Sequence, residues 1–239
     1  MFDHVTIRVG DRSASERFYE LALSTIGIDK TSSNEMGPEW DDFTLTEDTA
    51  TTRGLHIGFC AWSHEDVDRF WQAGVDAGYE SDGEPGMRTQ YRDDYYGSFL
   101  LDPDGNSVEA VHHGGMRPQG NIDHLWIRVP DLAATAAFYE KLSPYTGFRL
   151  SSRPPGRVHF DGEGTSFALL EDSYTTENLH IAFGTDSNNT VDGFHAAAIG
   201  AGYRDNGHPG ERPVYHPGYY GGFVLDPAGT NVEVVNHNR

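Results

Sequence analysis

The chain contains a single cysteine, Cys60, among its 239 residues, so it cannot form an internal disulfide bond. It has no apolar run near the roughly 18 residues that a membrane-spanning helix requires. A secretory signal would need a basic start followed by an apolar stretch, whereas here a strand-like alternation begins at Phe2. These absences favour a reducing compartment, and we expect a cytoplasmic protein with no membrane partner.

Basic residues are also scarce, with 17 Lys and Arg against 37 Asp and Glu, which gives a formal net charge of −20. Such a charge repels phosphate backbones, so nucleic acid is not an expected partner. It could attract a cationic ligand, although acidic residues spread along a chain are typical of a solvated surface. The remaining composition, 37% hydrophobic and 12% aromatic, is that of a globular protein.

The chain is two copies of one unit. Three segments of the first copy return in the second: 2–9 as 122–129, 55–59 as 179–183, and 107–111 as 231–235. The seam falls in a Gly-rich and Pro-containing stretch near residues 113–120. We therefore expect two domains, residues 1–116 and residues 117–239.

Within each copy the patterns predict two modules of the order βαβββ, and thus four modules of an α+β fold. Apolar and polar side chains alternate in residues 4–9, 55–60 and 107–111, as in half-buried strands. Helices are expected after four capping residues, Asp11, Ser63, Asp131 and Ser187. Residues 102–106 contain Pro and Gly between strand-like runs, which predicts a hairpin.

Each copy places His, His and Glu at matching points on the polar faces of its predicted strands. The candidate ligands are His4, His56 and Glu109 in the first copy and His124, His180 and Glu233 in the second. Their wide spacing requires two modules to fold face to face. Two neutral imidazoles and one carboxylate suit a divalent transition metal with open positions. The alternative is ordinary hydrogen bonding, with the glutamates paired to arginines of the same faces; the doubled triad favours the metal.

Other candidate site residues also come in pairs. Tyr and Arg residues precede the last hairpin of each copy, where a loop could supply phenols and cations to an oxygen-rich substrate. The candidate catalytic residues are Tyr91, Tyr95, Tyr215, Tyr219 and His216, and the candidate substrate-binding residues are Arg8, Arg88, Arg128, Arg212 and Trp126. His216 has Arg92 as its counterpart, so a general base there would exist only in the second copy. His195, which matches Trp71, is expected to be a packed or surface residue.

Four segments, 3–9, 179–183, 215–221 and 226–234, resemble the glyoxalase, bleomycin-resistance and extradiol-dioxygenase superfamily, whose members are also called vicinal oxygen chelate proteins. The resemblance covers nearly the whole chain, twice. It implies that the four modules form two incomplete β-barrels. It also implies that the six His and Glu residues bind a divalent metal ion, with iron, manganese, nickel and zinc all open.

The resemblance further implies a metal-dependent enzyme, acting on a small substrate chelated through neighbouring oxygens, and we favour a lyase-like reaction. Residues 42–46 and 165–169 lack the fourth ligand that glyoxalases offer there. Phe99 and Phe223 replace the catalytic tyrosine of extradiol dioxygenases. The alternatives are an extradiol-type dioxygenase, a protein that sequesters an antibiotic without catalysis, and a chain in which one copy only buttresses the other. The protein is expected to be a monomer or a homodimer.

Overall fold

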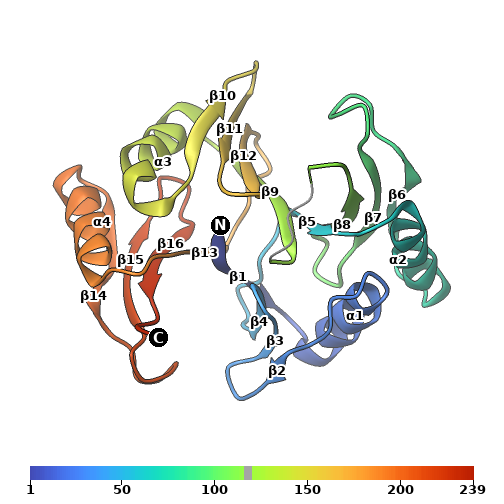
Figure 1. Cartoon of the computed structure of the whole chain (residues 1–239), viewed down its shortest axis with the longest axis horizontal. Coiled ribbons are helices and arrows are strands. Elements are labelled where there is room, and N and C mark those ends of the chain that lie inside the picture. The colour runs from blue at the N-terminus through green and yellow to red at the C-terminus, as the bar shows by residue number, and fades with distance from the viewer. Residues whose placement is uncertain (116–119) are drawn as a thin grey trace. The chain divides into compact units, whose positions relative to one another are not determined.

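The computed structural model describes residues 1–115 and 120–239. The predicted domain boundary between residues 116 and 117 lies outside these described residues. The elements follow the order βαβββ four times, which confirms the predicted modules and the α+β class (Figure 1).

The first copy contains the first two modules. Module 1 consists of β1 (Phe2–Val9), α1 (Arg12–Ser24), β2 (Ser32–Ser33), β3 (Pro38–Trp40) and β4 (Phe43–Glu47). Module 2 consists of β5 (Leu55–Cys60), α2 (His64–Asp76), β6 (Ser81–Met87), β7 (Tyr96–Leu101) and β8 (Ser107–His112).

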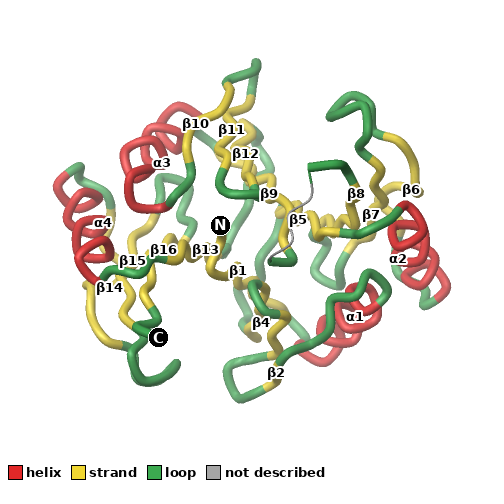
Figure 2. The backbone as a smooth tube through the Cα atoms, in the orientation of Figure 1, coloured by secondary structure: helices red, strands yellow, loops and turns green. Residues whose placement is uncertain are grey.

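The second copy repeats this order. Module 3 consists of β9 (Ile122–Val129), α3 (Leu132–Thr146), β10 (Arg149–Ser152), β11 (Arg157–Asp161) and β12 (Ser166–Glu171). Module 4 consists of β13 (His180–Gly184), α4 (Asn188–Gly200), β14 (Arg204–Glu211), β15 (Tyr220–Leu225) and β16 (Asn231–Asn236). In every module the helix packs against the module's own strands (Figure 2).

The chain forms two compact units that exchange part of the first strand of each copy. The N unit comprises Thr6–Trp126, and the C unit comprises Met1–Val5 together with Ile127–Arg239. Strand β1 therefore begins in the C unit, and strand β9 begins in the N unit. This exchange decides which side chains meet in each unit.

Each unit contains two runs of hydrogen-bonded strands. The N unit has the order β6-β7-β8-β5-β9 in one run and β1-β4-β3-β2 in the other. The C unit has β14-β15-β16-β13-β1 in one run and β10-β11-β12-β9 in the other. Among the described strands none of these runs closes on itself, as expected for incomplete barrels. Strand β5 pairs in parallel with β8, and β13 with β16.

Local signals explain where most helices begin. The carboxylates of Asp11 and Asp131 accept hydrogen bonds from the backbone N–H groups three residues later, and so does the hydroxyl of Ser63. The prediction for Ser187 was only partly right: it is the N-cap residue of α4, but its side chain makes no capping hydrogen bond. The hairpin between β7 and β8 is confirmed, and Gly105 occupies its turn with a φ of 85°.

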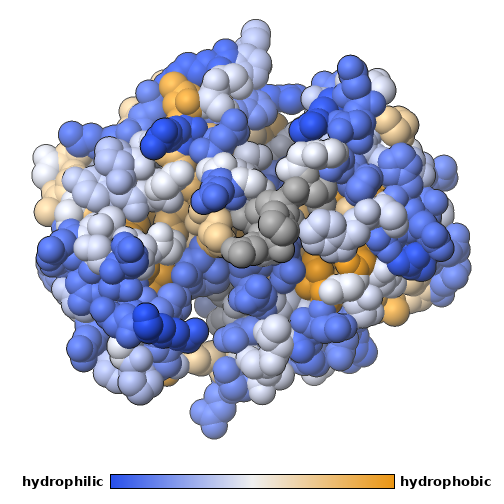
Figure 3. Space-filling model, viewed as in Figure 1, coloured by the Kyte–Doolittle hydropathy of each residue, from blue (hydrophilic) through white to orange (hydrophobic). Residues whose placement is uncertain are grey.

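The predicted apolar strand faces form the core of each unit. Val5, Ile7 and Val9 of β1 are fully buried, and the free Cys60 is buried at the end of β5. Polar residues predominate on the face drawn in Figure 3, where hydrophobic residues show in small groups. Within the two described ranges, every helix is too short or too polar to cross a membrane.

Candidate metal centres

In the N unit, His56, Glu109 and His124 come from the three adjacent strands β5, β8 and β9. Nε2 of His56 lies 3.0 Å from Oε2 of Glu109 and 3.1 Å from Nε2 of His124. Nε2 of His124 lies 3.3 Å from the same Oε2 atom. All three side chains are buried. We call this group the N centre.

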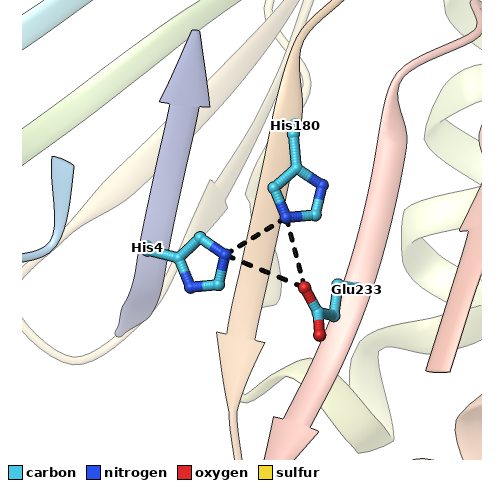
Figure 4. Close-up of side chains that lie close together, drawn as sticks. All are labelled: His4, His180 and Glu233. Carbon is cyan, nitrogen blue, oxygen red and sulfur yellow. Dashed lines mark hydrogen bonds and ion pairs between the residues drawn. The ribbon is translucent and has the colours of Figure 1, made fainter. Parts of the chain in front are cut away.

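In the C unit, His4, His180 and Glu233 form the equivalent C centre, from strands β1, β13 and β16 (Figure 4). Nε2 of His180 lies 3.2 Å from Nε2 of His4 and 3.2 Å from Oε2 of Glu233. Nε2 of His4 lies 3.8 Å from that oxygen. Glu233 is buried, whereas both imidazoles are partly exposed.

These groups correct the arrangement expected from the sequence. The six candidate ligands do converge three by three, but His4 lies with the second copy's His180 and Glu233, and His124 lies with the first copy's His56 and Glu109. The reason is that β1 and β9 each begin in the unit built mainly from the other copy. A periodic sequence pattern shows which face a residue occupies, but not which module its strand joins.

The outer ring nitrogens of the N centre are held by further polar groups. Nδ1 of His124 contacts a carboxylate oxygen of Asp123 at 2.9 Å. Nδ1 of His56 lies 3.0 Å from the hydroxyl of Ser107, which donates its own proton to Asp82 at 2.7 Å. These contacts favour a proton on Nδ1 of both rings and turn Nε2 toward Glu109. Such support fixes the tautomer and orientation of metal-binding histidines.

The C centre differs in one of these supports. Nδ1 of His4 contacts Asp3 at 2.8 Å, which matches the contact of His124 with Asp123 in the N centre. Asn231 replaces Ser107, however, and its amide nitrogen lies 2.7 Å from Nδ1 of His180. Its amide oxygen accepts a hydrogen bond from Asn206, which replaces Asp82. An amide nitrogen only donates, so this contact favours a ring proton on Nε2 of His180.

The electrostatics of the N centre favour a positive charge among its three ligand atoms. Burial alone lowers the pKa of His124, but hydrogen bonds to Asp123 and Glu109 outweigh it and raise that pKa to about 10. Burial raises the pKa of Glu109, but its two histidine partners lower it further than burial raises it. Without a cation a proton on His124 supplies the charge, and a divalent ion among the same three atoms would replace it. The residues of the N centre thus fit a metal.

Two glycines make room for the ligands of the N centre. A Cβ atom on Gly58 would lie 2.4 Å from the ring of His124, so only glycine lets this imidazole rest on strand β5. A Cβ atom on Gly97 would lie 2.4 Å from Glu109. The copy of Gly58 is Ala182, and the imidazole of His4 in the C unit is correspondingly more exposed than that of His124.

Two of the predicted tyrosines lie beside the glutamates: Tyr95 beside Glu109 and Tyr219 beside Glu233. The hydroxyl of Tyr219 donates a hydrogen bond to Oε1 of Glu233 at 2.7 Å, which leaves Oε2 for the imidazoles. Burial and the neighbouring Glu109 raise the pKa of Tyr95 far above its ordinary value, as burial and Glu233 do for Tyr219, so both phenols stay protonated. Their catalytic role stays a prediction.

Aromatic residues and an arginine border the N centre. The ring of Trp126 lies 5.3 Å from that of His56 and 5.3 Å from that of Tyr91, which is 43% exposed. Phe99 lies against His56, and the guanidinium of Arg88 stacks on Phe99 at 5.3 Å.

The C centre repeats part of this border. Phe223 lies 6.2 Å from His180 between ring centroids, and Arg212 stacks on Phe223 at 5.5 Å. Tyr215 packs against Tyr219 and is 46% exposed.

The remaining candidates lie farther from the ligands. Arg8 and Arg128 form ion pairs with Asp48 and Asp172. Their substrate-binding role stays a prediction. His216 contacts Nδ1 of His237 at 2.8 Å and so joins the supports of the C centre.

Sequence reasoning did not select the residues that support the imidazoles. His237 contacts Asp3, and His113 contacts Asp123, at 2.9 and 3.1 Å. A signal for them was present, because an Asp-His pair and a His after the last strand recur in both copies.

The profile of the Glyoxalase/Bleomycin resistance protein/Dioxygenase superfamily matches residues 1–110 and 121–234, two tandem segments that together span nearly the whole chain. The chain belongs to this superfamily. Its members include lyases and dioxygenases, many of which use divalent metal ions.

Solved structures of the superfamily share the fold. Glyoxalase I from Zea mays is 19% identical, with a TM-score of 0.70, and the match covers 99% of this chain and 92% of that one. A putative dioxygenase from Bacillus subtilis is 12% identical, with a TM-score of 0.67, over 100% of this chain and 85% of that one. No curated protein matches the sequence.

Proposed function

We propose that this superfamily member is a metal-dependent enzyme, in which the N and C centres each hold one divalent cation. The observation that carries the proposal is the convergence of two imidazole nitrogens and one carboxylate oxygen within 3.0–3.3 Å of one another in the N centre. The bound ion would act as a Lewis acid toward two neighbouring oxygens of a small substrate. The lyase-like reaction expected from the sequence is our first assignment.

The chain's own residues have distinct tasks in this proposal. His56, His124 and Glu109 supply three ligand atoms and leave further positions of the ion for the substrate. Trp126 and Tyr91 line one side of the N centre and would stack against a flat or apolar part of the substrate. Tyr95, kept neutral by burial and by Glu109, can donate a proton or a hydrogen bond from its hydroxyl but cannot act as a base at neutral pH.

Ring cleavage by an extradiol-type dioxygenase is the second candidate. It is favoured by the ligand set itself, because two histidines and one carboxylate with open positions are typical of non-haem iron(II) oxygenases. The phenylalanines at the expected tyrosine positions count against it, since Phe99 has no proton to give. Tyr95, beside Glu109, is the residue that could compensate.

One experiment separates these functions. The metal-free protein is reloaded with iron(II), manganese, nickel or zinc, and each form is assayed for turnover of a glutathione hemithioacetal and for oxygen uptake with catechols. Metal-dependent turnover of the hemithioacetal without oxygen uptake supports the lyase, and oxygen uptake with iron or manganese supports the dioxygenase. A protein that takes up no metal, and binds a bleomycin-type antibiotic with the same affinity before and after metal treatment, would contradict the proposal and favour sequestration.

A further inference from the structure

A third group of ligating side chains lies in the C unit, on helix α4 and strand β14. Nε2 of His195 lies 2.9 Å from Oδ1 of Asp205, and Nε2 of His208 lies 3.3 Å from Oδ2 of the same carboxylate. One ligand atom from each residue falls within 4.8 Å of the other two. None of these residues belongs to the C centre.

The backbone of β14 turns Asp205 toward the helix. The pairing of β14 with β15 shifts register between Asp205 and Gly207, and such irregularities re-aim a side chain. The N–H of Gly207 donates to Oδ1 of Asp205 at 2.9 Å, which fixes the carboxylate. His195 projects from α4 and is buried, whereas His208 is 83% exposed at its side chain. The group is therefore anchored on one side and open to solvent on the other.

The equivalent place in the first copy is built differently. Trp71, Ser81 and Glu84 occupy the three matching positions, and the indole N–H of Trp71 donates to the hydroxyl of Ser81 at 2.8 Å. That arrangement joins helix to strand with one neutral hydrogen bond and offers no pair of imidazoles. The second copy alone therefore has two histidines and a carboxylate at this point of the module.

We propose that His195, Asp205 and His208 form a third metal site, which binds a borderline divalent cation of the zinc class. Imidazole nitrogen and carboxylate oxygen are ordinary zinc ligands, and three protein ligands leave one position for water. The ion would take the place of the proton that Nε2 of His195 now directs at Asp205, and that proton would move to Nδ1 or be released to solvent. The bound ion would join α4 to β14. The site is separate from the N and C centres and does not depend on the function proposed for them.

Zinc titration against a chromophoric chelator tests the site in the full chain. His208→Ala removes one ligand from an exposed position, and Glu84→Ala alters the matching position of the first copy as a control. We expect the wild-type protein and Glu84→Ala to bind one more zinc ion per chain than His208→Ala. Equal zinc stoichiometry of His208→Ala and the wild-type protein would overturn the proposal.

The expected difference of one ion persists even when the N and C centres take up no zinc, so failure of the proposed function is distinguishable from failure of this site. Nuclear magnetic resonance of the imidazole rings gives a second measurement. Zinc should shift the ring signals of both His195 and His208 in the wild-type protein, and no longer those of His195 in His208→Ala. Unshifted His195 signals in zinc-saturated wild-type protein would contradict the proposal.

Discussion

In each centre a pair of polar residues supports Nδ1 of one histidine: Ser107 and Asp82 at His56, and Asn231 and Asn206 at His180. Exchanging these pairs between the centres should reverse which centre binds metal more tightly. In the N centre, Ser107 and Asp82 hold the ring proton of His56 on Nδ1, so Nε2 is ready to bind a cation. In the C centre, the amide nitrogen of Asn231 faces Nδ1 of His180, which favours a ring proton on Nε2, the nitrogen that would bind. A metal entering the C centre must first move that proton and turn the amide.

The size of the expected difference follows from what such supporting groups contribute to metal binding in general. Loss of a group that supports a metal-binding histidine lowers metal affinity by about 10-fold to 100-fold, or about 1.4 to 2.8 kcal/mol. We therefore expect the N centre to bind about 10-fold to 100-fold more tightly than the C centre. Asp82 is exposed, so most of the effect is assigned to the tautomer and not to the charge of this carboxylate.

The assay uses chains in which a single centre remains. His180→Ala leaves the N centre, His56→Ala leaves the C centre, and His208→Ala in both backgrounds removes the third site. Asp82→Asn with Ser107→Asn should weaken the remaining N centre about 10-fold or more. Asn206→Asp with Asn231→Ser should tighten the remaining C centre by a similar factor. Unchanged dissociation constants in both exchanged proteins would refute the reasoning, provided that circular dichroism shows both to be folded.

Three further predictions concern the N centre. Gly58→Ala should displace His124, because the added Cβ would lie 2.4 Å from its ring. We expect metal affinity at the N centre to fall at least about 10-fold, while metal titration of the C centre is unchanged. In the metal-free protein, the raised pKa of His124 stabilises the fold below its ordinary pKa of 6.5, and this contribution is lost as pH rises toward about 10. The lowered pKa of Asp123 stabilises the fold above the ordinary pKa of 3.8, and this contribution is lost on acidification. Urea unfolding should therefore show greatest stability between pH 3.8 and pH 6.5, with a flatter profile in Asp123→Asn. Adding metal at about 100 times its dissociation constant should raise the free energy of unfolding by about 2.7 kcal/mol per centre, and calorimetry that shows no shift between chelated and loaded protein would contradict binding to the folded state.

The fold could be read from the sequence because its signals are local. Alternation in residues 4–9 and the caps at Asp11 and Ser63 depend on neighbours within one turn or one strand, and the structure confirms them. Ser187 shows the limit of such signals, since a residue of the right type begins α4 without making the capping bond.

The composition of the centres could not be read in the same way. The face that carries His4 and His124 follows from alternation, but the module each strand joins depends on contacts far along the chain. Asp3 and Asp123 stand directly before these histidines in both copies and could have been recognised as their partners. The different partners of Nδ1 in His56 and His180 follow from the places of Ser107 and Asn231 beside the rings, which the sequence pattern does not show.

Anomalous X-ray diffraction from crystals of the metal-loaded protein tests the central claim most directly. Data collected on both sides of the metal's absorption edge should show one peak among His56, Glu109 and His124 and a second among His4, His180 and Glu233. Each ion should lie about 2.0–2.2 Å from its imidazole nitrogens and carboxylate oxygen. Peaks found only elsewhere on the chain, or centres with no anomalous signal at saturating metal, would contradict the account.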